Sequence, residues 1–220
     1  MRAAVKRRRY DSPRRSEQAR ETRRAILEAA RLLFTERGYG STTIGAVAGQ
    51  ARVAAETIYA AFGNKRSILA ELVDVSIAGD DAPVPILERP WVLRLREEPD
   101  PRARLRILAR NGRSMLERST PILEVLRGAA ATDPEIAGLW RRYKAQRLEG
   151  QRVLLGIVTE GGGLREGLTP DTALDVVFTL GSPETYGLLV GDRGWSPAAF
   201  ERWYEDALAR LLLPPRGPHD

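Results

Sequence analysis

The sequence predicts an all-α protein made of a small basic N-terminal unit and a larger C-terminal helical body. Helix-start signals recur along the chain, because a Ser, Thr or Asp is followed by Pro six times ahead of a periodic apolar stretch. Apolar residues then return at helical spacing, and no segment alternates apolar and polar residues as a half-buried strand does. The six pairs are Ser12-Pro13, Asp100-Pro101, Thr120-Pro121, Asp133-Pro134, Thr169-Pro170 and Ser196-Pro197.

Apolar spacing and stop signals define the clearest helices. A first helix over 14–37 ends at Gly38, because glycine readily takes the left-handed conformation that closes a helix. A longer central helix ends at three glycines, 161–163, and the last helix ends at the two prolines 214–215. The apolar faces of these helices comprise Ile26, Ala30, Leu33 and Phe34; Ile136, Leu139, Trp140 and Tyr143; and Phe200, Trp203, Tyr204, Ala207 and Leu211.

Residues 79–101 are the best candidate boundary between the two parts. This short segment contains Gly79 and five prolines, and clusters of glycine and proline interrupt regular structure. The segment separates the basic N-terminal unit from the larger C-terminal body.

Composition excludes most familiar enzyme sites. The chain of 220 residues has no cysteine, and its only histidine is His219, next to the C-terminus. A thiol nucleophile, a histidine-containing triad and a cysteine or histidine metal site are therefore excluded. No apolar run reaches the roughly 18 residues of a membrane span, and the basic N-terminus lacks the apolar region of a secretory signal. An all-α enzyme would have to use carboxylates and tyrosines alone, so we expect no enzymatic activity, no cofactor and no membrane partner.

The positive charge is concentrated at the N-terminus. Residues 1–24 hold ten basic and three acidic side chains, more positive charge than the net +6 of the whole chain. A basic arm on a nearly neutral body indicates a polyanionic partner such as nucleic acid. The alternative is a solvated tail in a chain that is rich in arginine throughout, with 32 Arg and 3 Lys.

Residues 43–62, TIGAVAGQARVAAETIYAAF, have the pattern of two short helices joined by a tight turn at Arg52-Val53. The first helix begins after the capping residue Thr43. With the helix over 14–37 as a brace, the pattern is that of a helix-turn-helix whose second helix enters the major groove of DNA by its N-terminal end. The side chains expected to face inward are Val47, Ala48, Ala51, Ile58 and Phe62.

The outward side chains of this unit are the candidate DNA contacts. Hydroxyl groups and a lysine suit phosphate contacts because they donate hydrogen bonds or charge, and Thr43 also lies near the positive end of a helix. Glu56 can accept a hydrogen bond from a cytosine amino group or be an ordinary solvated residue, and Ala60 can touch a thymine methyl group. The candidate contacts are Thr43, Ala55, Glu56, Thr57, Tyr59, Ala60 and Lys65, with Arg7, Arg8 and Arg9 of the arm.

The stretch from about residue 20 to residue 75 resembles the tetracycline-repressor (TetR) family. A C-terminal run, residues 182–186 with 194–197, also resembles one ligand-binding branch of that family. The resemblance implies a homodimeric transcriptional regulator, usually a repressor, which a small molecule releases from its operator. The matching residues are Phe34, Gly38, Tyr39, Thr42, Thr43, Val47, Ala48, Ala51, Val53, Thr57, Ile58, Tyr59, Phe62, Lys65 and Leu69.

Three positions depart from the family pattern. The turn glycine of the family is Arg52 here, which argues against a left-handed turn conformation at that position. The usual serine cap of the second helix is Ala54, which costs about 1 kcal/mol of local helix stability. The aromatic or histidine residue that usually precedes Phe62 is Ala61, which removes one expected backbone contact with DNA.

The C-terminal body carries two further sets of candidates. Scattered large side chains suit a cavity for an apolar or aromatic effector, with ordinary core packing as the alternative for any one of them. Two helices, 170–190 and 197–213, have apolar faces wider than one covering helix needs, which favours a four-helix dimer interface over intrachain core. The candidate effector contacts are Trp91, Met115, Trp140, Tyr143 and Phe178, and the candidate interface residues are Ala173, Val177, Leu180, Phe200, Trp203, Ala207 and Leu211.

Together these observations predict a cytoplasmic, ligand-responsive transcriptional regulator with operator DNA, a small-molecule effector and a second copy of itself as partners. The alternative is a helical small-molecule- or partner-binding protein that has lost operator binding. The expected domains are a disordered basic arm over 1–15, a DNA-binding domain over 16–79, a ligand-binding and dimerisation domain over 80–213, and a tail over 214–220.

Overall fold

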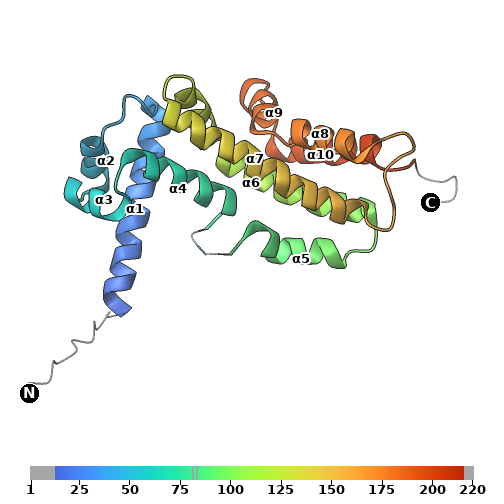
Figure 1. Cartoon of the computed structure of the whole chain (residues 1–220), viewed down its shortest axis with the longest axis horizontal. Helices are drawn as coiled ribbons and strands as arrows, with labels where there is room; N and C mark the ends of the chain where they lie inside the picture. The colour runs from blue at the N-terminus through green and yellow to red at the C-terminus, as the bar shows by residue number, and fades with distance from the viewer. Residues whose placement is uncertain (1–12, 81, 83, 216–220) are drawn as a thin grey trace, which may run out of the picture. The chain divides into compact units, whose positions relative to one another are not determined.

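The computed structural model describes residues 13–80, 82 and 84–215, which form helices joined by turns and, within these ranges, contain no strand (Figure 1). The all-α prediction is confirmed. The elements are α1 (Pro13–Arg37), α2 (Ile44–Ala51), α3 (Ala55–Phe62), α4 (Lys65–Ala78), the 3-10 turn η1 (Ile86–Glu88), α5 (Pro90–Glu97), α6 (Pro101–Ala130), α7 (Pro134–Thr159), α8 (Pro170–Leu180), α9 (Pro183–Tyr186), the π-helical turn η2 (Gly187–Asp192) and α10 (Pro197–Leu212).

Most of the helix starts lie where the capping pairs predict them. In α6, α7, α8 and α10 the residue before the proline is extended, and its side-chain oxygen accepts a hydrogen bond from the backbone of the first turn. Proline is tolerated at this first position because its missing N–H would have no partner inside the helix. Ser182 caps α9 in the same way, ahead of Pro183, and this short helix was not among the predicted starts.

The pair Thr120-Pro121 does not start a helix, which corrects the prediction. Pro121 lies inside α6, which runs unbroken from Pro101 to Ala130. The packing explains why, since Leu116 before the proline and Ile122 after it are both buried, while the proline itself is exposed. Burial along the whole helix outweighs the backbone hydrogen bond that the proline removes.

The described chain divides into two compact units at Leu69–Ala70, within α4. The expected domain boundary after residue 79 remains a prediction. The candidate boundary segment 79–101 contains η1 and α5, and Val92 and Leu95 of α5 are fully buried in the core of the second unit. This part of the segment is therefore a packed element, because the apolar residues on one face of α5 pack against that core.

The first unit is built on the apolar face of α1. Ile26, Ala30, Leu33 and Phe34 are all buried, as the helical spacing predicts. Helix α1 packs against α2, and α2 packs against α3. Val47, Ala48, Ile58 and Phe62 supply the buried side chains of the two short helices, while Ala51 is only partly covered.

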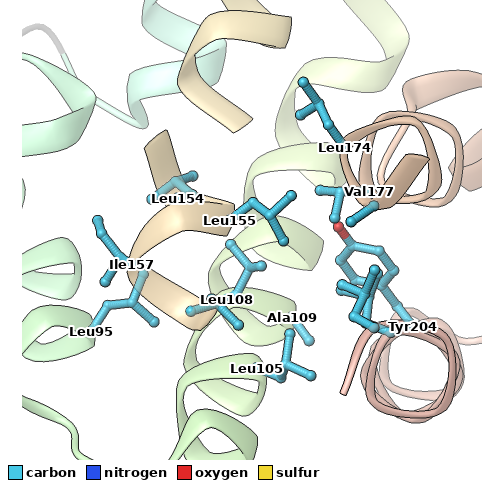
Figure 2. Packing of buried hydrophobic residues seen from close by; sticks show 14 of the residues in the cluster. Leu95, Leu105, Leu108, Ala109, Leu154, Leu155, Ile157, Leu174, Val177 and Tyr204 are labelled. Atoms are coloured by element: carbon cyan, nitrogen blue, oxygen red, sulfur yellow. The ribbon is translucent and has the colours of Figure 1, made fainter. Parts of the chain in front are cut away.

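The second unit is a helical bundle around α6 and α7. These two helices pack along each other, and α5, α8, α9 and α10 cover them. Figure 2 shows Leu155 of α7 beside Leu108 of α6, Ile157 of α7 beside Leu95 of α5, and the hydroxyl of Tyr204 of α10 near Val177. Within the described ranges, every helix is too short or too polar to cross a membrane.

Candidate functional site

The turn between α2 and α3 keeps a left-handed conformation although it carries no glycine. Thr43 begins α2 by accepting a hydrogen bond from the N–H of Ala46 at 3.1 Å. Arg52 ends the helix with φ 56° and ψ 42°, and it is the only non-glycine residue with positive φ in the described part of the chain. The N–H of Val53 then donates to the carbonyl of Ala48 at 3.0 Å. The expectation that Arg52 would prevent this conformation was therefore wrong, because the closing hydrogen bonds hold the residue there.

Helix α3 begins without a side-chain cap. Ala54 has the extended backbone of a capping residue, with φ −72° and ψ 149°, but its methyl group accepts no hydrogen bond. Glu56 in the first turn places a negative charge near the positive end of the helix, which offsets part of this loss. The helix ends at Gly63, whose φ is 75°.

The outer face of α3 presents most of the candidate DNA contacts. Glu56 and Ala60 are exposed, Tyr59 is 55% exposed, and Ala55 and Thr57 are partly covered. Thr43 is also exposed, at the start of α2. This face combines hydroxyl groups, one carboxylate and small apolar side chains, so it can meet both phosphates and base edges of a major groove.

Lys65 is held inside the unit. Its ammonium group donates to the carbonyls of Tyr39 at 2.7 Å and Thr42 at 2.8 Å, and it lies 4.2 Å from the centre of the Tyr39 ring. The hydroxyl of the buried Thr42 lies 2.9 Å from the carbonyl of Gly38. Lys65 therefore ties the first turn of α4 to the loop before α2, a positioning role that the sequence pattern did not reveal.

Arg23 is a second positioning residue that sequence reasoning missed. In the sequence it is one of the ten basic residues of the segment 1–24. Its guanidinium donates to the carbonyl of Ala61 at 2.8 Å and lies 4.2 Å from the centre of the Phe62 ring. Arg23 thereby fixes the end of α3 against α1. The arm residues Arg7, Arg8 and Arg9 lie outside the described residues.

The second unit contains two adjoining cavities between α4, α6 and α7. One has a volume of about 410 Å³ and the other about 380 Å³, and both are lined by Met115, Gln151 and Leu154. These volumes suit a small organic ligand. Residues from the last turns of α4, Ile77 and Ala78, line both cavities. Residues of α4 and α7, which are far apart in the sequence, therefore line the same cavities.

The candidate effector contacts are only partly brought together. Trp91 lines the first cavity, Met115 lines both and Tyr143 lines the second. Trp140 lines neither and stacks on Tyr143, with ring centres 5.3 Å apart. Phe178 also lines neither; its ring supports the guanidinium of Arg147 at 3.8 Å. Burial raises the pKa of Tyr143 to about 12, so its hydroxyl stays protonated and can donate a hydrogen bond.

The candidate interface residues fall into two groups. Ala173, Val177 and Phe200 are buried within the second unit itself, with at most 2% of each side chain exposed. The others face outward to different degrees. Leu180, Trp203 and Ala207 are partly exposed and Leu211 is 40% exposed. Only this outer group is available to a second copy of the chain.

Comparison with known proteins finds a family match that covers most of the described part of the first unit. Residues 26–72 match the family described as "Bacterial regulatory proteins, tetR family". The chain is 26% identical over 178 residues to the HTH-type transcriptional regulator YdeS of Bacillus subtilis (strain 168), covering 77% of this chain and 79% of YdeS.

Solved structures share the fold of both units. NalD of Pseudomonas aeruginosa, the secondary repressor of the MexAB-OprM multidrug efflux pump, matches with a TM-score of 0.67 and 24% identity over 90% of this chain and 98% of its own. The transcriptional regulator FadR of Bacillus subtilis, solved in complex with stearoyl-CoA, matches with a TM-score of 0.66 and 22% identity over 84% and 96%. With the helix-turn-helix geometry, these findings show that residues 26–72 form a domain similar to the DNA-binding domain of the bacterial tetR-family regulators, and that the whole chain has the fold of such regulators.

Proposed function

We propose that this chain is a transcriptional regulator of the TetR type, a cytoplasmic repressor that binds a palindromic operator as a homodimer and is released by a small molecule. The observation that carries the proposal is that the two ends of α4 take part in two different sites. Its first residue, Lys65, holds the loop before α2, and its last residues, Ile77 and Ala78, line the cavities of the second unit. One continuous helix thus carries a contact to the DNA-reading motif and a wall of the ligand site.

The DNA-binding part of the proposal uses the outer face of α3 and the start of α2. Thr43, Thr57 and Tyr59 bind phosphates, while Glu56 and Ala60 face base edges in the major groove. A dimer binds two half-sites about one helical turn, 34–36 Å, apart.

The effector part of the proposal follows from the walls of the cavities. A ligand that fits only one position of Ile77 and Ala78 favours the conformation of α4 that has this position. The size of the shift is set by the difference between the ligand's affinities for the two conformations of α4. The stearoyl-CoA in FadR and the repressor role of NalD support small-molecule control of repression in a protein of this fold. Trp91, Met115 and Tyr143 are the proposed contacts, with Trp140 and Phe178 acting through their neighbours.

The dimer part of the proposal rests on apolar surface that the chain does not cover itself. The proposed dimer surface combines apolar side chains of α8 and α10 that are at least partly exposed with Leu188, which is 55% exposed. A two-fold axis through this surface would bury it against an identical copy. The proposed dimer surface consists of Leu180, Leu188, Trp203, Ala207 and Leu211.

A second candidate function is a ligand-binding helical protein that has lost operator binding. The observation that favours it is the uncapped start of α3 at Ala54, together with the small side chains at Ala55 and Ala60. Such a helix offers few groups that read bases.

A gel shift with the DNA upstream of its own gene separates the two functions. The proposed repressor retards a specific fragment as a dimer, and light scattering gives twice the mass of one chain at micromolar concentration. A monomer, or a protein that retards all fragments equally, contradicts the proposal and favours the second candidate.

A further inference from the structure

The second cavity, of about 380 Å³, has an apolar body and a polar wall on α7. Ile77 of α4, Met115 and Leu116 of α6, and Leu154 of α7 contribute apolar surface. Arg147 and Gln151 contribute polar side chains, and they lie one helical turn apart on the same face of α7.

Each of these two polar side chains has a buried atom without a partner. The Nε of Arg147 and the Oε1 of Gln151 are both sealed from solvent, and neither makes a hydrogen bond within the described part of the chain. Buried polar atoms without partners are uncommon in native structures and call for an explanation. Here both atoms belong to residues that line one cavity, so a small rotation of each side chain toward the cavity lets a bound ligand supply the missing partners.

The guanidinium of Arg147 is a charge without a carboxylate partner. Its terminal nitrogens donate to the carbonyls of Phe178 at 3.1 Å and Gly181 at 3.4 Å, and its plane lies over the Phe178 ring. Within the described residues, no salt bridge involves Arg147, and Glu184 acts on it only at longer range. Burial lowers the pKa of Arg147, but an arginine keeps its proton in a protein. A positive charge is thus held at the cavity wall with one N–H unused.

Gln151 suits an anion beside this charge. Rotation of its amide by 180° exchanges oxygen and nitrogen, so the side chain can present either an acceptor or a donor to the cavity. A ligand carboxylate can then accept from Nε of Arg147 and from the amide nitrogen of Gln151. The protonated hydroxyl of Tyr143 is a third donor in the same cavity.

Asp74 is the other charged residue that lines this cavity, and its carboxylate would favour a ligand with a positive group. Its side chain is covered only in part, so water still solvates the carboxylate and no partner is required. Partial burial and the neighbouring Glu71 raise the pKa of Asp74. The sealed Arg147, which water does not reach at Nε, therefore determines the preferred charge more than Asp74 does.

We propose that the effector site of this chain takes an amphiphilic anion, with a carboxylate on Arg147 and Gln151 and an apolar chain against Ile77, Met115 and Leu154. This inference rests on the proposed function, because it names the chemical class of the effector. It distinguishes the site from one built for a cation or for a neutral hydrocarbon.

Three probes with one tail and different heads test the inference in the full-length protein. Decanoate, 1-decanol and decyltrimethylammonium are titrated by calorimetry at pH 7, each below its micellar concentration. A charge-assisted hydrogen bond to a partly buried arginine predicts that decanoate binds at least about tenfold more tightly than 1-decanol. Equal or tighter binding of decyltrimethylammonium, or no binding of any probe, overturns the inference.

Variants of α7 then test whether Arg147 and Gln151 cause the preference for decanoate over 1-decanol. Arg147→Gln should abolish the preference for decanoate over 1-decanol, whereas Arg142→Gln, at an exposed arginine of the same helix, should retain it. Gln151→Glu should also reduce decanoate binding selectively, because it gives Arg147 a carboxylate of its own, and it serves if Arg147→Gln fails to fold. A preference for decanoate that survives both changes overturns the inference.

A second pair of variants tests whether the probes occupy this cavity. A Cβ built at Gly150, which lines the cavity, meets open space, and so does one at Gly156, which does not line it. Gly150→Leu should weaken decanoate binding at least about tenfold, while Gly156→Leu should leave it unchanged. Equal effects of the two changes would show that decanoate does not bind in this cavity. The gel shift without any probe is scored separately, so a protein that binds its operator but shows no preference for decanoate loses only this inference.

Discussion

At the scale of single residues, Arg52 shows how a helix-turn-helix can keep its turn without the usual glycine. The residue occupies the left-handed region with φ 56°, where a side chain costs roughly 1–2 kcal/mol relative to glycine. The closing hydrogen bonds of the turn, from Arg52 and Val53 back into α2, hold this conformation. The turn is therefore formed at the expense of stability in the first unit.

Replacing Arg52 by glycine should stabilise the first unit. The gain is about 1 kcal/mol, because relief of the left-handed strain exceeds the added backbone entropy of glycine in the unfolded chain. Urea unfolding followed by circular dichroism measures the change. Arg52→Ala is the matched control, since it removes the same side chain but keeps a Cβ at positive φ. If Arg52→Ala gains as much as Arg52→Gly, the side chain and not the backbone conformation is responsible.

At the scale of elements, the anchor of α4 changes what Lys65 is expected to do. The sequence pattern suggested a phosphate contact, but two hydrogen bonds commit the ammonium group to the loop before α2. Lys65→Met should lower stability by about 1–2 kcal/mol and weaken DNA binding at all sequences. The slope of log affinity against log salt should stay the same, because no phosphate contact is lost.

The salt slope separates the two roles of Lys65. A lost phosphate contact reduces the slope by about 0.9, whereas loss of a positioning residue does not. Tyr59→Phe is the control, because this exposed residue should affect DNA binding without changing stability. A flatter slope and unchanged stability for Lys65→Met would show that Lys65 contacts DNA directly.

Arg104 is the corresponding anchor of the second unit. It is only 7% exposed, and it donates to the carbonyls of Glu98 at 2.5 Å, Ile157 at 2.9 Å and Glu160 at 2.6 Å. It thereby ties the start of α6 to the end of α7. Arg104→Met should lower the free energy of unfolding by about 2–4 kcal/mol, because three carbonyl groups lose a charged donor.

Denaturant unfolding of two matched variants checks the role of Arg104. Arg106→Met, two residues along the same helix, removes an exposed side chain whose ion pair with Asp100 spans 4.0 Å. This control should change stability by less than about 0.5 kcal/mol. Similar losses for the two variants would mean that Arg104 is not an anchor.

The sequence predicts elements better than it predicts sites. Capping pairs and helical spacing locate the starts of α6, α7, α8 and α10, because these signals are local. Thr120-Pro121 carries the same local signal and fails, since burial on both sides of the proline decides the outcome. The cavity wall at Arg147 and Gln151 has no local signal at all. Both are residue types of ordinary helix surfaces, and only the convergence of α4, α6 and α7 makes them a site.

At the scale of the whole molecule, the chain combines two compact units that share α4, and a strongly basic N-terminal segment outside the described residues. Residues 1–12 carry five of the basic side chains. Deleting them should lower DNA affinity, most at low salt, and flatten the salt slope by about 0.9 for each phosphate that the arm neutralises. The preferred sequence should change little. An unchanged slope in a fluorescence-anisotropy titration would mean that the arm does not contact DNA.

The central claim is that two copies of the chain read two half-sites of an operator through α3. A nuclease footprint of the full-length protein on the DNA upstream of its own gene tests it most directly. We predict two protected half-sites related by two-fold symmetry, with centres about one helical turn or a whole number of turns apart. Tyr59→Phe should weaken the protection of both half-sites equally. A single unpaired protected segment, or no specific protection below the roughly micromolar range of non-specific binding, would contradict the account.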